Sequence, residues 1–227
     1  MAGHETQIDG LNVQWIDHST VKIKTAGSAP KVIYIDPFGQ VLKGNEEKAD
    51  LIISTHEHFD HFDPQAINKL TKDDTEVVLK KGINKSALKA KSVREIDIGG
   101  SVETKGAKIK AVHAYNEHRF REPGQPFHPK GFGMGVIVEI EKIFYYAGDT
   151  DFIGEMKALK DEKIDVAFLP IGGTYTMDVP EAVEAALAIS PKIVIPTHYN
   201  FISGTDADPS DFKKRVESRS SIEVRIL

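Results

Sequence analysis

Three histidines and an aspartate lie within the six residues His56-Glu57-His58-Phe59-Asp60-His61. Imidazole nitrogens and carboxylate oxygens are the ligands that a zinc-type ion accepts, at about 2.0–2.2 Å. In an extended segment alternate side chains point the same way, so His56, His58 and Asp60 converge while His61 faces elsewhere. One short segment therefore offers ligands in two directions, which indicates a site for two neighbouring metal ions.

The histidine-rich run lies between a predicted strand and a predicted helix. The apolar residues Leu51-Ile52-Ile53 precede it and Asp63-Pro64 follows it. Asp as the N-cap and Pro at the first helical position are typical of a helix start. The run is neither terminal nor part of a low-complexity segment, which disfavours the alternative of a tag or an adventitious metal binder.

Composition limits how such a metal could be held. The chain has 227 residues, of which 40% are hydrophobic and 28% charged, and it contains no cysteine. This length favours one large domain with its own core, which we expect to span residues 1–227. Without cysteine there is no disulfide and no thiolate ligand, so nitrogen and oxygen atoms must bind the metal.

Charge and hydropathy exclude several classes of partner. The net charge of −5 argues against non-specific binding to nucleic acid, which needs a basic face. The first ten residues are polar and no apolar stretch approaches the ~20 residues of a membrane helix, so we expect neither a signal peptide nor a membrane span. Cytoplasmic localisation is the default expectation, and association into a homo-oligomer is left open.

Short β-branched segments alternate with helical segments along the chain. Strands are predicted at residues 13–16, 21–25, 32–35, 51–54, 76–79, 93–98, 108–112, 135–140, 143–147, 165–169, 192–195 and 222–226. Helices are predicted at residues 64–70, 84–90, 152–159, 178–189 and 208–218. Strands followed by helices, twice over, indicate two sheets packed face to face with helices on both outer sides, in an α/β or α+β fold.

Three motifs in this arrangement resemble the metallo-β-lactamase superfamily. His-x-His-x-Asp-His after a buried strand is similar to its signature, and Gly148-Asp149-Thr150 resembles the strand-end motif whose Asp bridges two metals. Residues 195–199, Ile-Pro-Thr-His-Tyr, resemble its last ligand motif. The matches run in the superfamily's order from about residue 13 to about residue 205. The resemblance implies a four-layer αβ/βα sandwich and a metal-dependent hydrolase.

Further motifs resemble one branch of that superfamily. They are Ile16-Asp17-His18-Ser19-Thr20, Ile35-Asp36-Pro37-Phe38 and residues 170–178. The branch contains the ascorbate 6-phosphate lactonase-like and the N-acyl phosphatidylethanolamine phospholipase D-like hydrolases. It implies a small, anionic ester as the substrate, either a lactone or a phosphodiester.

The resemblance also implies the ligands of two metal sites. The residues at the matching positions are His56 and His58 for the first site, Asp60, His61 and His198 for the second, and Asp149 as the bridge. Two zinc ions per chain are expected, although nitrogen and oxygen ligands also accept manganese, iron or nickel. A metal-bound hydroxide would attack the substrate, with Asp60 as the catalytic residue that orients it and receives its proton.

The third ligand of the first site is less constrained by the sequence. His113 ends the predicted strand 108–112, where such a ligand should lie, and we favour it. His118 and His128 lie in the following loop and are the alternatives that could replace or supplement it. These two histidines, together with Tyr199, are also the candidates for contact with the substrate.

Two other functions are compatible with the same motifs. A nuclease of the same superfamily is one, although the acidic balance and the lack of an additional RNA-binding segment disfavour it. A non-catalytic metal-binding protein is the other, and the intact ligand set argues against it.

Overall fold

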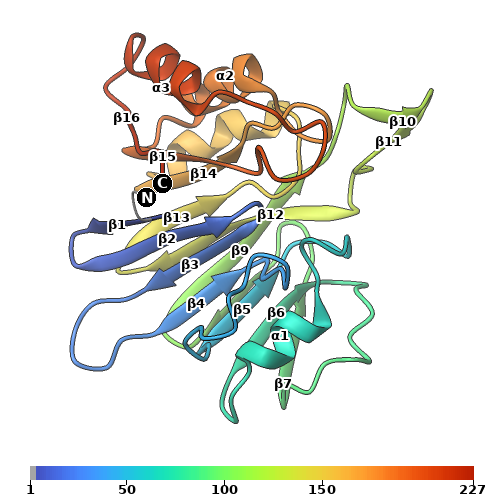
Figure 1. Cartoon of the computed structure of the whole chain (residues 1–227), viewed down its shortest axis with the longest axis vertical. Helices are drawn as coiled ribbons and strands as arrows, with labels where there is room; N and C mark the ends of the chain where they lie inside the picture. The colour runs from blue at the N-terminus through green and yellow to red at the C-terminus, as the bar shows by residue number, and fades with distance from the viewer. Residues whose placement is uncertain (1–3) are drawn as a thin grey trace.

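Two seven-stranded sheets form the centre of the molecule in the computed structural model, which describes residues 4–227 (Figure 1). The first sheet runs in chain order through β1 (Glu5–Ile8), β2 (Leu11–Asp17), β3 (Thr20–Lys24), β4 (Val32–Ile35), β5 (Leu51–Ser54), β6 (Glu76–Lys80) and β7 (Ser92–Ile96). The second runs through β16 (Glu223–Val224), β15 (Ile193–Thr197), β14 (Val166–Pro170), β13 (Lys142–Tyr146), β12 (Gly133–Ile140), β9 (Ala107–Ala114) and β8 (Ser101–Thr104). A separate hairpin, β10 (Phe120–Glu122) and β11 (Gln125–Pro126), projects from the body of the protein (Figure 1).

Side-chain alternation in the first sheet separates two cores. In β4, Ile33 and Ile35 join the large core that the two sheets share, whereas Val32 and Tyr34 face the other way. This outward face packs against helix α1 (Pro64–Leu70), whose Asp63 N-cap accepts hydrogen bonds from the first turn. Apolar residues on both faces are expected of strands that are covered on both sides.

The second sheet is covered on its outer side by α2 (Val179–Ile189), α3 (Pro209–Glu217) and the 3₁₀ helix η1 (Gly154–Glu162) (Figure 1). Helix α2 begins as the sequence predicts, because the Asp178 side chain accepts a hydrogen bond from the backbone N–H of Glu181. Its alanine-rich face is buried in the large core. The expected four-layer αβ/βα sandwich is therefore confirmed. None of the helices within residues 4–227 has the length and apolarity needed to cross a membrane.

Some local predictions differ from the structure. Residues 84–90 form turns rather than a helix, with Leu88 N–H donating to the carbonyl of Lys85. Only Leu88 and Ala90 of this segment pack against the core, and so short a helix is marginal without a packed face. The sequence predicts a helix at residues 152–159, whereas the structure has the 3₁₀ helix η1 at residues 154–162. The sequence predicts no strand at the positions of β1, β8, β10 and β11.

The shared core should dominate stability. Phe144 in β13 is fully buried, whereas Phe120 in β10 is 43% exposed. We expect Phe144→Ala to lower the free energy of unfolding by about 3–5 kcal/mol, because it leaves a cavity. The matched change Phe120→Ala should cost about 0.5 kcal/mol or less. Urea denaturation with a chelator in every sample measures both, and equal effects would contradict this description of the core.

Candidate metal centre

Four donor atoms from three loops face one another beyond the ends of β5, β13 and β15. His61 Nε2 lies 3.2 Å from Asp149 Oδ1, 3.3 Å from His198 Nε2 and 3.6 Å from Asp60 Oδ2. His198 Nε2 lies 3.3 Å from Asp149 Oδ1 and 3.6 Å from Asp60 Oδ2. Tetrahedral ligands at zinc-type bond lengths are about 3.3–3.4 Å apart. These atoms, here called the His61 set, therefore have the spacing that one such ion requires.

A second group of donors lies on the other side of Asp149. His128 Nε2 is 3.1 Å from His58 Nδ1 and 3.2 Å from Asp149 Oδ2. His56 completes the group, since His56, His58 and His128 place their donor atoms within 4.8 Å of one another. We call these three histidines and Asp149 Oδ2 the His56 set. The two oxygens of one carboxylate thus face two adjoining groups of imidazoles, and a donor atom of His56 also lies within 4.8 Å of donor atoms of His61 and Asp149.

Unpartnered buried atoms support a metal at this place. His56 Nε2 and Asp149 Oδ1 are buried and make no hydrogen bond within the described residues 4–227. A buried polar atom without a partner costs free energy, so such atoms need an explanation. Both atoms belong to the sets defined above, and a bound cation would satisfy each. The nitrogen and oxygen donors present therefore fit two divalent ions.

Hydrogen bonds behind the ligands fix which imidazole nitrogen faces the centre. His61 Nδ1 donates to Asp36 Oδ2 at 2.7 Å. His56 Nδ1 donates to Thr55 Oγ1 at 3.0 Å, and that hydroxyl donates to Asp36 Oδ2 at 2.7 Å. With Nδ1 committed in this way, Nε2 of both histidines is left as the metal-facing atom. Asp36 thereby orients one ligand of each set.

His128 reaches the centre from a long loop that other side chains hold in place. Asn116 Oδ1 accepts from both the backbone N–H and Nδ1 of His128, at 2.9 and 2.8 Å. Asn116 in turn donates to Asp151 Oδ1 at 2.8 Å, and Asp151 forms an ion pair with Arg119 at 2.6 Å. This chain of contacts ties the His128 loop to the segment that carries Asp149.

Backbone geometry positions the carboxylate of Asp149 between the two sets. Gly148, directly before Asp149, has a φ of +65°, and a Cβ there would lie 2.8 Å from the carbonyl oxygen of Met134. Any residue with a side chain would be strained and would clash at this position. The glycine of the Gly-Asp-Thr motif therefore allows β13 to turn and direct Asp149 to the centre.

His18 supports the His61 set from the turn between β2 and β3. Its Nε2 donates to Asp60 Oδ2 at 2.9 Å, and its ring centroid lies 3.9 Å from that of His198. Its backbone carbonyl accepts from His198 N–H at 3.0 Å. Burial lowers the pKa of His18 to about 4, so the ring is neutral at neutral pH. It acts as a hydrogen-bond donor that orients Asp60.

Electrostatics at the centre favour a cation. Burial alone would raise the pKa of Asp149, but His198 and His61 hold it well below its ordinary value. Burial opposes a charge on His61, yet Asp149, Asp60 and Asp36 outweigh it and raise its pKa well above its usual range. Burial lowers the pKa of His56 well below its ordinary value and that of His58 to about 4. His56 and His58 are therefore neutral imidazoles beside an ionised Asp149, which are the protonation states that metal ligation needs, and at His61 a bound cation would take the place of the proton that the three carboxylates favour.

Three of the predicted site residues lie elsewhere than expected. His113 belongs to neither set within residues 4–227; its ring faces Tyr115, with centroids 6.1 Å apart. The geometry thus favours His128 over His113, because the loop after β9 folds back and brings His128 to the centre. His118 is exposed, and Tyr199 is buried in a stack on Trp15, with centroids 4.9 Å apart. Sequence reasoning missed Asn116 and Asp151; the spacing Asp149-x-Asp151 was the available signal.

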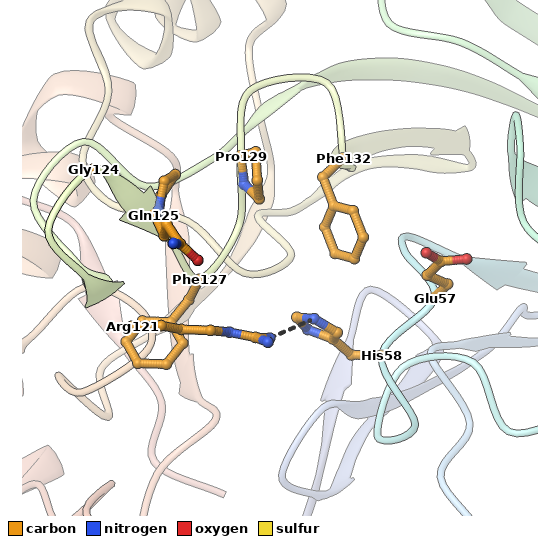
Figure 2. Close-up of a pocket in the computed structure, with 9 residues that line it drawn as sticks. Glu57, His58, Arg121, Gly124, Gln125, Phe127, Pro129 and Phe132 are labelled. Atoms are coloured by element: carbon orange, nitrogen blue, oxygen red, sulfur yellow. Dashed lines mark hydrogen bonds between the residues drawn. The ribbon is translucent and has the colours of Figure 1, made fainter.

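Two adjoining cavities lead to the centre. The inner one has a volume of about 290 Å³ and is lined by His58, Phe59, Asp60, Arg121, Phe127, His128, Asp149, Tyr175, His198 and Ile202. The outer one, of about 740 Å³, lies against the β10–β11 hairpin and shares His58, Arg121 and Phe127 with the inner cavity (Figure 2). The donor sets therefore open to the exterior through a partly apolar entrance.

Comparison with known proteins identifies the family of this chain. The family described as "Beta-lactamase superfamily domain" matches residues 12–198. A UPF0173 metal-dependent hydrolase from Pelotomaculum thermopropionicum is 35% identical, with 96% of each chain covered. Another from Thermoplasma acidophilum is 34% identical, with 91% of each chain covered.

Solved structures give the same result. A protein from Parabacteroides distasonis, provisionally named a metal-dependent hydrolase, is 33% identical with a TM-score of 0.81, covering 99% of this chain and 97% of the other. Igni18, a metallo hydrolase from Ignicoccus hospitalis, is 28% identical with a TM-score of 0.74, covering 96% and 94%. The chain therefore belongs to the β-lactamase superfamily and, within it, to the UPF0173 family of metal-dependent hydrolases.

Proposed function

We propose that this enzyme hydrolyses a small anionic ester, a lactone or a phosphodiester, with one divalent ion in each donor set. The observation that carries the proposal is the position of Asp149, whose two oxygens face two groups of imidazoles beside a cavity. A volume of about 290 Å³ is close to the lower end of the usual range for small-molecule sites. Zinc is the first candidate, and manganese, iron and nickel fit the same ligand types.

The proposed chemistry divides between the ions and the side chains. Two divalent ions would lower the pKa of a shared water towards neutrality and polarise the attacked carbonyl or phosphoryl oxygen. Asp60 lines the inner cavity, so its carboxylate can orient the attacking water and accept the proton that it loses. His18 holds that carboxylate through the 2.9 Å hydrogen bond to Oδ2. The relatives' description as metal-dependent hydrolases supports the reaction class.

Metal content tests the two donor sets. We expect about two zinc ions per chain in the purified, zinc-loaded protein, because each set has enough donors for one ion. His128→Ala should retain about one, since it removes a ligand of the His56 set alone. His113→Ala, the matched control on β9, should retain about two. Elemental analysis measures the zinc content of all three proteins. If His113→Ala retained about one ion and His128→Ala about two, His113 and not His128 would be the ligand.

The hydrogen bond between His128 and Asn116 leads to a separate prediction. Asn116→Ala removes the acceptor that orients His128, so we expect about 10- to 100-fold weaker binding of one of the two ions. Titration against a fluorescent chelator measures this affinity. Asn84→Ala, in an exposed turn, is the control and should bind both ions as the parent does. Unchanged affinity in Asn116→Ala would show that the loop holds His128 without this hydrogen bond.

Turnover tests the assignment of Asp60. Asp60→Asn keeps the shape of the side chain and removes its negative charge, so we expect hydrolysis to fall by about 100- to 10,000-fold. The assay uses a panel of lactones and phosphodiesters with zinc supplied, and elemental analysis of the same samples reports metal retention. Asp73→Ala, at a side chain that is 96% exposed, is the control. Full activity in a metal-replete Asp60→Asn protein would remove Asp60 from the reaction.

A further inference from the structure

Arg121 differs from the other arginine of the same loop in having no acidic partner. Arg119 forms ion pairs with Asp151 at 2.6 Å and with Glu181 at 2.5 Å, so its charge is committed. Arg121 forms no ion pair with a carboxylate of residues 4–227. It lines both cavities, and no lysine or other arginine of those residues does so. Its guanidinium lies 5.7 Å from the ring centroid of Phe127. A cation held over an aromatic ring at the mouth of a cavity is available to a ligand.

When His58 ligates a metal through Nδ1, its Nε2 can no longer accept a hydrogen bond from Arg121. Arg121 Nη2 lies 3.4 Å from His58 Nε2, which is long for a hydrogen bond and requires Nε2 to accept (Figure 2). In the His56 set His58 presents Nδ1 to the centre, at 3.1 Å from His128 Nε2. An imidazole that ligates through Nδ1 carries its proton on Nε2, which then can only donate. Two donors would then face each other, and a shared acceptor would satisfy both.

We infer that Arg121 and the Nε2–H of His58 form a subsite for an oxyanion of the substrate, either a carboxylate or a phosphate. This inference rests on the proposed function, because it needs His58 as a metal ligand. An oxygen between two such donors makes charge-assisted hydrogen bonds, and the guanidinium can bind a second oxygen of the same group. The subsite lies where the two cavities join, so the scissile bond would lie on the inner side and the anionic group at the entrance.

The neighbours of Arg121 indicate what is attached to the anion. Phe127 and Tyr175 meet edge to face with centroids 4.9 Å apart, and both line the inner cavity with Ile202. Phe59, which is 63% exposed, lines the same cavity. Exposed apolar side chains grouped around a cavity mark a binding surface. The substrate class is therefore a small ester with an anionic group next to an apolar part.

Calorimetric titration of the zinc-loaded protein with phenyl phosphate and with benzoate tests the subsite. We expect Arg121→Gln to weaken binding of at least one probe about 10-fold or more, and Arg121→Lys to weaken it less, because it keeps the charge and loses the planar fork. Lys130→Gln removes a cation of the same loop that pairs with Glu155 at 2.8 Å and lines neither cavity, so it should bind as the parent does. Weakening of both probes supports a general oxyanion subsite, and weakening of phenyl phosphate alone supports one for phosphate.

The metal content of the same samples separates the two ways in which this inference could fail. Unchanged affinity in an Arg121→Gln protein that retains about two zinc ions would overturn the subsite and leave the proposed function standing. A parent protein that binds none of zinc, manganese, iron and nickel would overturn both, since His58 would then have no reason to carry its proton on Nε2.

Discussion

The rest of this centre depends on the contacts between the Asp149 carboxylate and the imidazoles around it. Its Oδ1 lies 3.2 and 3.3 Å from His61 and His198, and its Oδ2 lies 3.2 Å from His128. A buried carboxylate is costly unless cations or donors surround it. The fold meets this requirement with imidazoles from three separate loops, and the same arrangement places those imidazoles at the spacing that divalent ions need.

The two sheets bring these loops together. His56 follows β5 of the first sheet, whereas Asp149 and His198 follow β13 and β15 of the second. Each of these strands has a parallel neighbour, and ligands in layered α/β folds usually bind beyond the carboxyl ends of parallel strands. The packed core between the sheets therefore fixes the positions of the two halves of the centre relative to each other. The β10–β11 hairpin contributes Arg121, Gln125 and Pro126 to one wall of the entrance.

The layered fold could be predicted from the sequence, because alternation, caps and buried runs are local signals. Ligands at strand ends could also be assigned as hypotheses, because the motifs that contain His56, Asp149 and His198 resemble those of the superfamily. His128 could not be chosen over His113 in this way. Its position depends on Asn116 and Asp151, whose contacts span sequence separations of 12 and 35 residues. At residues 84–90 the sequence predicts a helix that the structure does not contain. The segment has helix propensity, but it has no packed face that would stabilise a helix.

The position of metal ions around Asp149 can be determined from a crystal structure of the zinc-loaded protein, with anomalous scattering measured at the zinc edge. We expect two peaks about 3.5–4 Å apart, one beside each oxygen of Asp149, with His128 and not His113 as a ligand. A single peak, or a pair that Asp149 does not bridge, would contradict this expectation.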